Sequence, residues 1–292
     1  MIYAIRLTIT HHYGQPAANG RHVIRVAPAT LLGRQHLTTS LLDISPAPDS
    51  RADGTDFFGN RTVTCAHKAP HRDMSIQLTG HVEVTTPPPW HDRSPNLETL
   101  VGQWQQGRSL DPEAPLHFLG PTRRLTPDRA ITAFAADIYD PGGSVAANVI
   151  AIGEALHRAL TFDATATTVE TDAAEAFQLR RGVCQDFTHI MILALQALGI
   201  PAAYVSGYLR TLPPEGGARL AGADAMHAWV RAWCGVEQGW IEYDPTNATL
   251  VGADHIVVGY GRDYTDIAPV SGYLRASGTQ RNTQAVDVTV LR

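Results

Sequence analysis

The second half of this 292-residue chain contains a cysteine, a histidine and an aspartate whose positions could support nucleophilic chemistry. The cysteine is Cys184 in the stretch RRGVCQDFTH, directly before the apolar run 187–198. This pattern predicts a helix that begins near Cys184 and ends at Gly199. Free amide groups and the positive end of the helix dipole favour a thiolate in the first turn. Cysteine is also often a small buried hydrophobe, so its position alone leaves both interpretations open.

A nucleophilic thiol needs a base within hydrogen-bonding distance, and the base needs a group that orients it. The predicted strand HAWVRAWCGV begins with His227, and the next predicted strand, GWIEYDPTN, carries Asp244. A two-residue turn at Gly235 and Val236 would place His227 directly opposite Asp244, and a slip of two residues would keep both on one face. Each residue alone is weak evidence, but their joint placement after a helix-starting cysteine favours a Cys-His-Asp triad.

Two further positions are candidates for the surroundings of this triad. Trp229 shares its strand face with the histidine and is a candidate for one wall of the cleft. Asp263, like the pair Asp254–His255, could line a cleft near Asp244 or could be a satisfied loop residue.

No motif in the sequence indicates a metal site or a cofactor. The three cysteines are an odd and sparse set without a CxxC pair, so neither a disulfide framework nor a thiolate zinc site is expected. His11 and His12 are neighbours on a predicted strand and point to opposite faces. Cys65 and Cys234 have no predicted base nearby and are expected to pack. A reducing cytoplasm is the expected location.

The elements that must position these residues fall into two regions. Residues 1–90 are expected to form an N-terminal antiparallel β-sandwich or small barrel, because short alternating segments are separated by turn-rich stretches such as YGQPAANG. The proline-rich segment 85–95 cannot continue a strand or a helix and marks the boundary. Residues 91–292 are expected to form an α+β domain, with helices first and an antiparallel sheet after them.

Two helices are predicted before the cysteine helix. Apolar residues at helical spacing predict one over residues 144–160. Asp172, followed three residues later by Glu175, forms a plausible capping pair for the other, with Gly182 as its C-terminal stop. The tail DVTVLR is expected to be a last strand.

Composition restricts the partners. The net charge is −5 without a basic stripe, so neither nucleic acid nor an anionic membrane surface is expected to bind. The N-terminal segment lacks the basic head, apolar run and cleavage site of a signal peptide. No stretch reaches the roughly 18 apolar residues that a membrane span needs.

Several segments resemble the transglutaminase-like superfamily of cysteine enzymes, and most closely its bacterial branch of cysteine proteases with an N-terminal β domain. In the second region these segments are GVCQDFTH, GIPAAYVSGYL, DAMHAWVRAW, GWIEYDPTN and GRDYTDIAPVSG. In the first region they are HHYGQPA, DFFGN and HVEV. The resemblance therefore covers nearly the whole chain.

The resemblance implies a papain-like arrangement in which the cysteine helix packs on the antiparallel sheet. At matching positions it implies that Cys184 is the nucleophile, His227 the base and Asp244 the acid that orients the histidine. Asp186 matches the G-x-C-x-D pattern and is expected to be structural or to tune the field at the helix start. The backbone N–H of Cys184 would be one oxyanion donor, and the second has no clear counterpart.

Together these features predict acyl transfer through a thioester acyl-enzyme. Water as the acceptor would make the protein a cysteine peptidase or amidase, and an amine would make it a transglutaminase or ligase. Hydrolysis is favoured, because the extra domains and acidic metal sites of calcium-regulated animal transglutaminases are not recognisable. The expected substrate is a peptide, a protein or a small γ-glutamyl or other amide. A non-enzymatic binding scaffold is the remaining alternative, and the N-terminal domain is a candidate surface for homo-oligomers.

Overall fold

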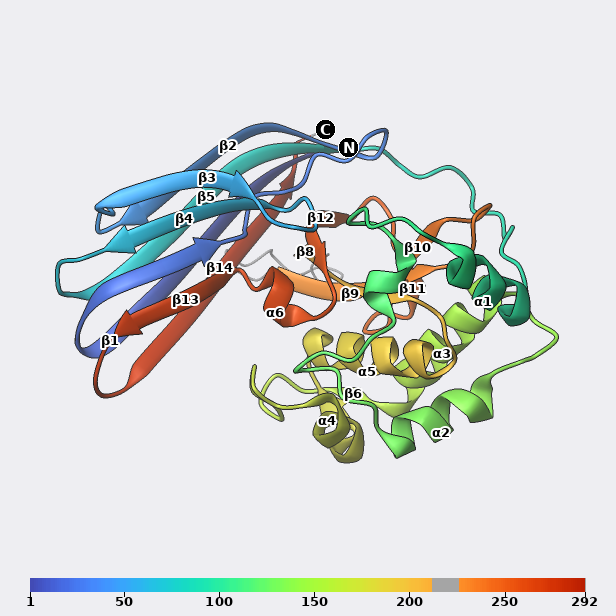
Figure 1. The fold of residues 1–292 in the computed structure, drawn as a ribbon. Coiled ribbons are helices and arrows are strands. Elements are labelled where there is room, and N and C mark those ends of the chain that lie inside the picture. Colours follow the sequence, from blue (N-terminus) through green and yellow to red (C-terminus); the bar gives the residue numbers. More distant parts are fainter. Residues whose placement is uncertain (212–225, 292) are drawn as a thin grey trace, which may run out of the picture.

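The N-terminal β domain is organised around one very long strand, β1 (Ile2–Ile24). The structure is a computed structural model that describes residues 1–211 and 226–291, so the first two residues of DAMHAWVRAW lie outside the described residues. Around β1, a seven-stranded antiparallel sheet curves into a barrel-like layer (Figure 1). Its other strands are β2 (Gln35–Ser45), β3 (Ser50–Thr55), β4 (Arg61–His67), β5 (His71–Val84), β13 (Val270–Arg275) and β14 (Gln280–Val290).

The expected turn at YGQPAANG is instead the middle of β1. The register of β1 shifts between His12 and Ala17 against β5, and again between Ala18 and Arg21 against β13. Such bulges bend a strand and increase its twist, so β1 changes partners from β5 and β14 to β4 and β13 without ending. The expected sandwich or barrel is therefore confirmed as a curved sheet that encloses one apolar core. At YGQPAANG, however, the chain continues as a strand where a turn was expected.

The last two strands close this sheet from the far end of the chain. β14 pairs with the first half of β1, and β13 pairs with its second half. The range 91–292 expected for the second domain is therefore corrected, since residues 270–290 belong to the N-terminal sheet. The strand at DVTVLR was predictable from its alternation, but its partner was not, because the local pattern carries no information on so distant a pairing.

The second domain has the expected α+β fold, with a five-stranded antiparallel sheet in the order β11-β10-β9-β8-β12. Its strands are β8 (Ala202–Leu209), β9 (Met226–Trp233), β10 (Trp240–Asp244), β11 (Thr249–Leu250) and β12 (His255–Gly261). A small parallel pair joins β6 (Thr161–Phe162) and β7 (Arg181–Gly182). The helices are α1 (Leu97–Gln106), the 3₁₀ helix η1 (Pro115–Phe118), α2 (Arg129–Ile138), α3 (Val145–Ala159), α4 (Ala173–Leu179), α5 (Cys184–Ala197) and α6 (Tyr264–Ile267).

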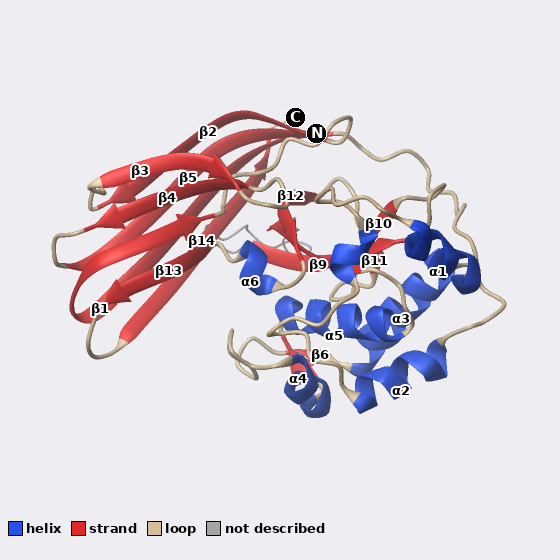
Figure 2. Ribbon diagram, in the orientation of Figure 1, coloured by secondary structure: helices blue, strands red, loops and turns tan. Residues whose placement is uncertain are grey.

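Helices cover one face of this sheet, and residues of the β domain cover the other. Figure 2 shows α1 to α5 gathered on the side of the molecule away from the N-terminal strands, while α6 lies beside those strands. Helix α5 packs on β8 and β9, and residues 185–195 of it are all buried. On the opposite face, Trp229 and Val257 pack against Ala29 and Leu31, which lie between β1 and β2. The sheet is therefore held between two layers, and α5 forms the centre of one of them.

The helices before α5 form largely as the sequence predicts. Helix α3 buries the expected apolar stripe completely. At α4, the Asp172 carboxylate accepts a hydrogen bond of 2.8 Å from the backbone N–H of Glu175. The helix ends at Leu179, slightly earlier than expected, because Arg180 takes a left-handed conformation with φ of 54° and Gly182 enters β7. Residues 85–96 form neither helix nor strand. Within the described ranges, no helix combines the length and the apolar character needed to cross a bilayer.

An ion pair between the half-buried Arg34 and the buried Glu242 joins the β domain to the second sheet. Two guanidinium nitrogens of Arg34, just before β2, donate to the Glu242 carboxylate in β10, with Nη2 2.7 Å from Oε2. The same carboxylate accepts from Nε1 of Trp229 at 2.7 Å and from the Tyr260 hydroxyl at 3.2 Å. Burial would raise the pKa of Glu242, but the charge and hydrogen bonds of Arg34 outweigh burial and lower it.

Arg34→Met is expected to destabilise the protein by about 3 kcal/mol, because it leaves the Glu242 charge buried without its cation. Chemical denaturation measures this loss as a change in the free energy of unfolding. The matched control is Arg158→Met, which removes an exposed pair with Glu154 at 3.7 Å and is expected to change stability by less than about 0.5 kcal/mol. Equal effects of the two substitutions would contradict the interpretation of Arg34 as the partner of the buried carboxylate.

Candidate active site

Cys184 is the first residue of α5, and Val183 is the N-cap. The backbone N–H of Cys184 therefore has no acceptor inside the helix and is free to bind an anionic group. The buried carboxylate of Asp186 accepts from the Val183 N–H at 2.7 Å and from the Thr167 hydroxyl at 2.6 Å. Burial raises the pKa of Asp186, and these two hydrogen bonds only partly offset it. The structure thus places Asp186 as the side chain that fixes the start of the helix.

The register of β9 and β10 is shifted by two residues from the expected one, in which His227 would lie directly opposite Asp244. Trp233 pairs with Trp240, and Ala232 pairs with Ile241. The connection is longer than a two-residue turn, since it includes both Gly235 and Gly239 at positive φ and is closed by a 2.9 Å bond from the Cys234 N–H to the Gly239 carbonyl. A shift of two preserves the faces of a strand, so the histidine and the aspartate still lie on one side.

Asp244 holds His227 through a short hydrogen bond, with Nε2 of His227 2.7 Å from Oδ2. The fully buried carboxylate also accepts from Nε2 of His255 at 3.1 Å, from the Thr246 N–H at 2.9 Å and from two donors of Asn247. Burial alone would raise the pKa of Asp244, but the bonds from His227 and His255 lead a set of interactions that hold it far below its usual range. Because a carboxylate only accepts, both imidazoles must carry a proton on Nε2.

His227 lies between this carboxylate and the thiol. Burial lowers the pKa of His227, but hydrogen bonds to Asp244 and to Cys184 and the charges of both outweigh burial and raise it to about 10. Nε2 is occupied by the aspartate, which leaves Nδ1 to face the sulfur. The stable form of the ring is therefore an imidazolium bound to the Asp244 carboxylate, and this arrangement can deliver a proton from Nδ1.

The Trp229 ring packs beside the ring of His227 and is not exposed in a cleft. Its side chain is fully buried, and its ring centroid lies 6.1 Å from that of His227 at an interplanar angle of 33°. Gly207 pairs with His227 across β8 and β9, and a Cβ there would lie 2.3 Å from Cη2 of Trp229. The indole can occupy this position because residue 207 has no side chain. The expectation that Trp229 lines the cleft is therefore corrected.

Asp263 is a satisfied capping residue and is not part of the set around Asp244. It is buried, caps α6 by accepting from the Thr265 N–H at 2.7 Å, and accepts from the Thr122 hydroxyl. Of the two alternatives open from the sequence, the structure supports the satisfied loop residue. His255, from the same stretch, does reach Asp244.

One neighbour of the thiol, Tyr204, was not predicted from the sequence. Tyr204 of β8 faces α5, and burial, followed by the charge of Cys184, raises its pKa well above the usual value. Its hydroxyl is therefore neutral and able to donate. No sequence signal marks this residue, because an aromatic residue within AAYVSGYL is indistinguishable from a packing residue until the helix is placed on the sheet.

His227, Asp244 and His255 also place three ligand-type atoms within 4.8 Å of one another. Both histidines point an Nε2 proton at the carboxylate, so a cation there would have to displace both protons. Their present hydrogen bonding is that of an oriented base and a supporting second imidazole.

Comparisons with known proteins agree with this geometry. Residues 132–245 match the family model of the transglutaminase-like superfamily, and residues 3–83 match that of the bacterial transglutaminase-like N-terminal region. This chain belongs to the transglutaminase-like superfamily. A transglutaminase-like core thus follows a β region that is itself typical of the bacterial members.

Two relatives of this transglutaminase-like chain come from mycobacteria. Rv2569c of Mycobacterium tuberculosis is 34% identical over 267 residues, covering 88% of this chain and 82% of that protein. ML0607 of Mycobacterium leprae is 29% identical over 298 residues, covering 98% and 99%. A solved structure from Cytophaga hutchinsonii, described as a "putative cysteine protease", has a TM-score of 0.77 at 22% identity, covering 100% of this chain and 91% of that one. That similarity shows a common fold across both domains.

The histidine is expected to remain protonated at pH 8, because its pKa is raised from 6.5 to about 10. Titration of ¹⁵N-histidine-labelled protein by NMR measures this value. Asp244→Asn and Cys184→Ala each remove an interaction that raises the pKa, so each should lower the pKa of His227.

The control for this titration is Asp263→Asn, which changes an equally buried aspartate that caps a different helix. This substitution should leave the pKa of His227 unchanged. A wild-type pKa near the ordinary value of histidine would contradict the coupling of the three side chains.

Proposed function

We propose that this protein is a Cys-His-Asp acyl-transfer enzyme whose main reaction is hydrolysis of an amide or isopeptide bond. The observation that carries the proposal is the position of His227, bound to the buried Asp244 at 2.7 Å and close enough to Cys184, at the start of a helix, for the two side chains to interact. A thiol, a base and an orienting acid in this order are the requirements of nucleophilic catalysis by cysteine.

Each residue has one task in the reaction. The thiolate of Cys184 attacks the carbonyl carbon, and the Cys184 N–H donates to the oxygen that becomes negative. The Nδ1 proton of His227 passes to the leaving amine as the C–N bond breaks, which leaves a thioester and a neutral imidazole. Asp244 keeps the ring oriented throughout. Water then attacks the thioester while Nδ1 takes its proton, and the acid leaves as the thiolate and imidazolium are restored.

We propose hydrolysis as the main reaction and amine transfer as the alternative. For the substrate we propose a chemical class and not a single compound. The proposed substrate is a peptide, a protein or a small γ-glutamyl or other amide, in line with the description of the Cytophaga hutchinsonii protein as a "putative cysteine protease". The alternative is transfer of the acyl group to an amine, which uses the same three residues. A reducing cytoplasm is the proposed location, in keeping with the sparse and odd set of three cysteines. Homo-oligomers through the N-terminal domain stay a prediction.

Profiling against peptide and γ-glutamyl amide libraries, with and without an added primary amine, tests the proposal. Hydrolysis products that persist in excess amine are expected, and Cys184→Ala should abolish them. Dominant amine incorporation would replace hydrolysis by the transferase alternative. Equal product formation by wild type and Cys184→Ala would overturn the acyl-transfer proposal altogether.

Iodoacetamide is expected to alkylate Cys184 faster than either other cysteine at neutral pH. Cys65 and Cys234 are buried, and burial raises the pKa of both thiols. Cys184 is more exposed and lies beside an imidazolium. Mass spectrometry of native protein after a time course of labelling measures the three rates. Labelling of Cys184 at or below the rate of the other two would contradict its role as the nucleophile.

A further inference from the structure

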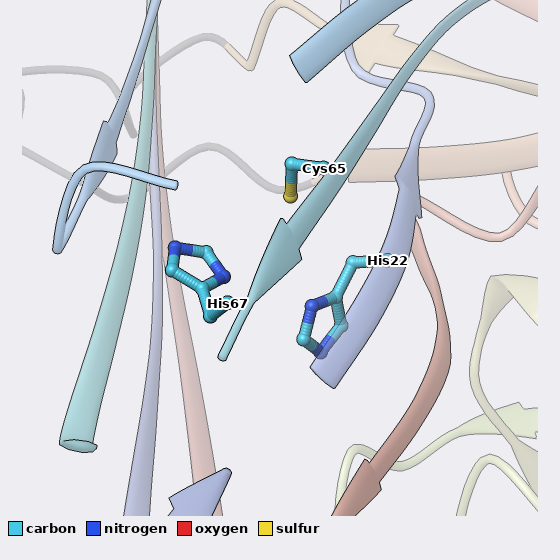
Figure 3. Close-up of side chains that lie close together, drawn as sticks. All are labelled: His22, Cys65 and His67. Carbon is cyan, nitrogen blue, oxygen red and sulfur yellow. The ribbon is translucent and has the colours of Figure 1, made fainter. Parts of the chain in front are cut away.

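A second cluster of reactive side chains lies in the β domain, outside the acyl-transfer site. Strands β1 and β4 pair so that His22 is directly opposite Cys65. His67 follows Cys65 by two positions and therefore points to the same face of β4. Figure 3 shows the sulfur and the two imidazole rings turned toward a common space. One potential ligand atom from each residue lies within 4.8 Å of the other two.

These three side chains are almost completely buried, with exposed fractions of 5% for His22, 1% for Cys65 and 3% for His67. Nδ1 of His22 and Nδ1 of His67 have no hydrogen-bond partner among the described residues. A buried polar atom without a partner costs about 1 to 3 kcal/mol, so two of them beside a thiol require an explanation. A bound ion between them removes both costs at once.

The other ring nitrogen of His67 supports this interpretation. Nε2 lies 2.8 Å from the carbonyl oxygen of Pro46, to which it donates. A metal-binding histidine typically donates one ring N–H to a carbonyl in this way, which fixes the tautomer and directs the other nitrogen at the ion. Gly20 gives the ring of His22 its space, because a Cβ at position 20 would lie 2.9 Å from Cε1.

We propose that His22, Cys65 and His67 bind a Zn²⁺ ion that stabilises the β domain. Zinc–nitrogen bonds of about 2.1 Å and zinc–sulfur bonds of about 2.3 Å place tetrahedral ligand atoms about 3.4 to 3.6 Å apart. Atoms already within 4.8 Å reach this geometry by closing about 1 Å through side-chain rotation. A set of two imidazoles and one thiolate selects zinc-type ions over Mg²⁺ or Ca²⁺, which prefer oxygen ligands. On binding, the Cys65 thiol loses its proton to solvent and the sulfur forms the bond to zinc.

The fourth position is assigned to a water molecule. Such a water would complete a tetrahedral set with the three side chains. The ion would connect β1 to β4 beside the bulge at which β1 changes partners.

The test uses full-length, tag-free protein that has been treated with a chelator and then titrated with Zn²⁺ or Co²⁺. Binding of one equivalent of Zn²⁺, a rise in unfolding temperature with Zn²⁺, and a near-ultraviolet thiolate-to-cobalt band with Co²⁺ are expected. Cys65→Ala should abolish the cobalt band. It should weaken zinc binding by more than about 100-fold, since even indirect partners of a metal contribute 10- to 100-fold.

Two controls separate this site from the acyl-transfer site. Cys184→Ala removes the other thiol able to produce the cobalt band, and His255→Gln disrupts the other cluster of metal-ligand type. Both should bind zinc as the wild type does. His67→Gln provides a second test if Cys65→Ala folds poorly, and it should weaken zinc binding while leaving hydrolysis at saturating substrate unchanged. Failure of the wild type to bind one equivalent, or undiminished binding by the folded Cys65→Ala and His67→Gln variants, would overturn the proposal.

Discussion

The buried carboxylate of Glu242 is the interaction on which the arrangement of the two domains depends. Its charge is stable in the interior only because Arg34 reaches it from the β domain, while Trp229 donates to it from the neighbouring strand. The same indole lies beneath the ring of His227. Separation of the domains would therefore leave an unpaired buried charge and would release the support of the histidine. Stability and the geometry of the reactive set have a common origin in this one group.

The β domain makes this connection as a second layer of the fold. Besides Arg34, two buried amides bind the backbone of β12 in both directions. Gln35 accepts from the Val257 N–H and donates to its carbonyl, and Asn60 does the same with Tyr260. Each amide therefore replaces a neighbouring strand at an edge that would otherwise be unpaired. The β domain therefore covers one face of the five-stranded sheet and completes its edge at β12.

The position of His227 and Asp244 on one face of the sheet was more predictable from the sequence than the connections of the fold. Placing His227 and Asp244 on one face required only the two-residue period of a strand, which a register error of two residues does not disturb. The turn itself was wrong, because the positive φ of Gly239 cannot be told from composition. Arg34 could not be assigned to Glu242 either, since nothing local relates an arginine before β2 to a carboxylate in β10. For the same reason the proximity of His22 and Cys65 was not predictable, because only the pairing of β1 with β4 brings these two residues together.

The course of β1 has a consequence for how this sheet can form. One edge of β1 is covered by β13 and β14, which lie far from it along the chain. Until these distant strands pair, that edge presents unpaired amides and carbonyls together with an apolar face. Such an edge can pair with another copy of the chain, so folding competes with association until the sheet closes.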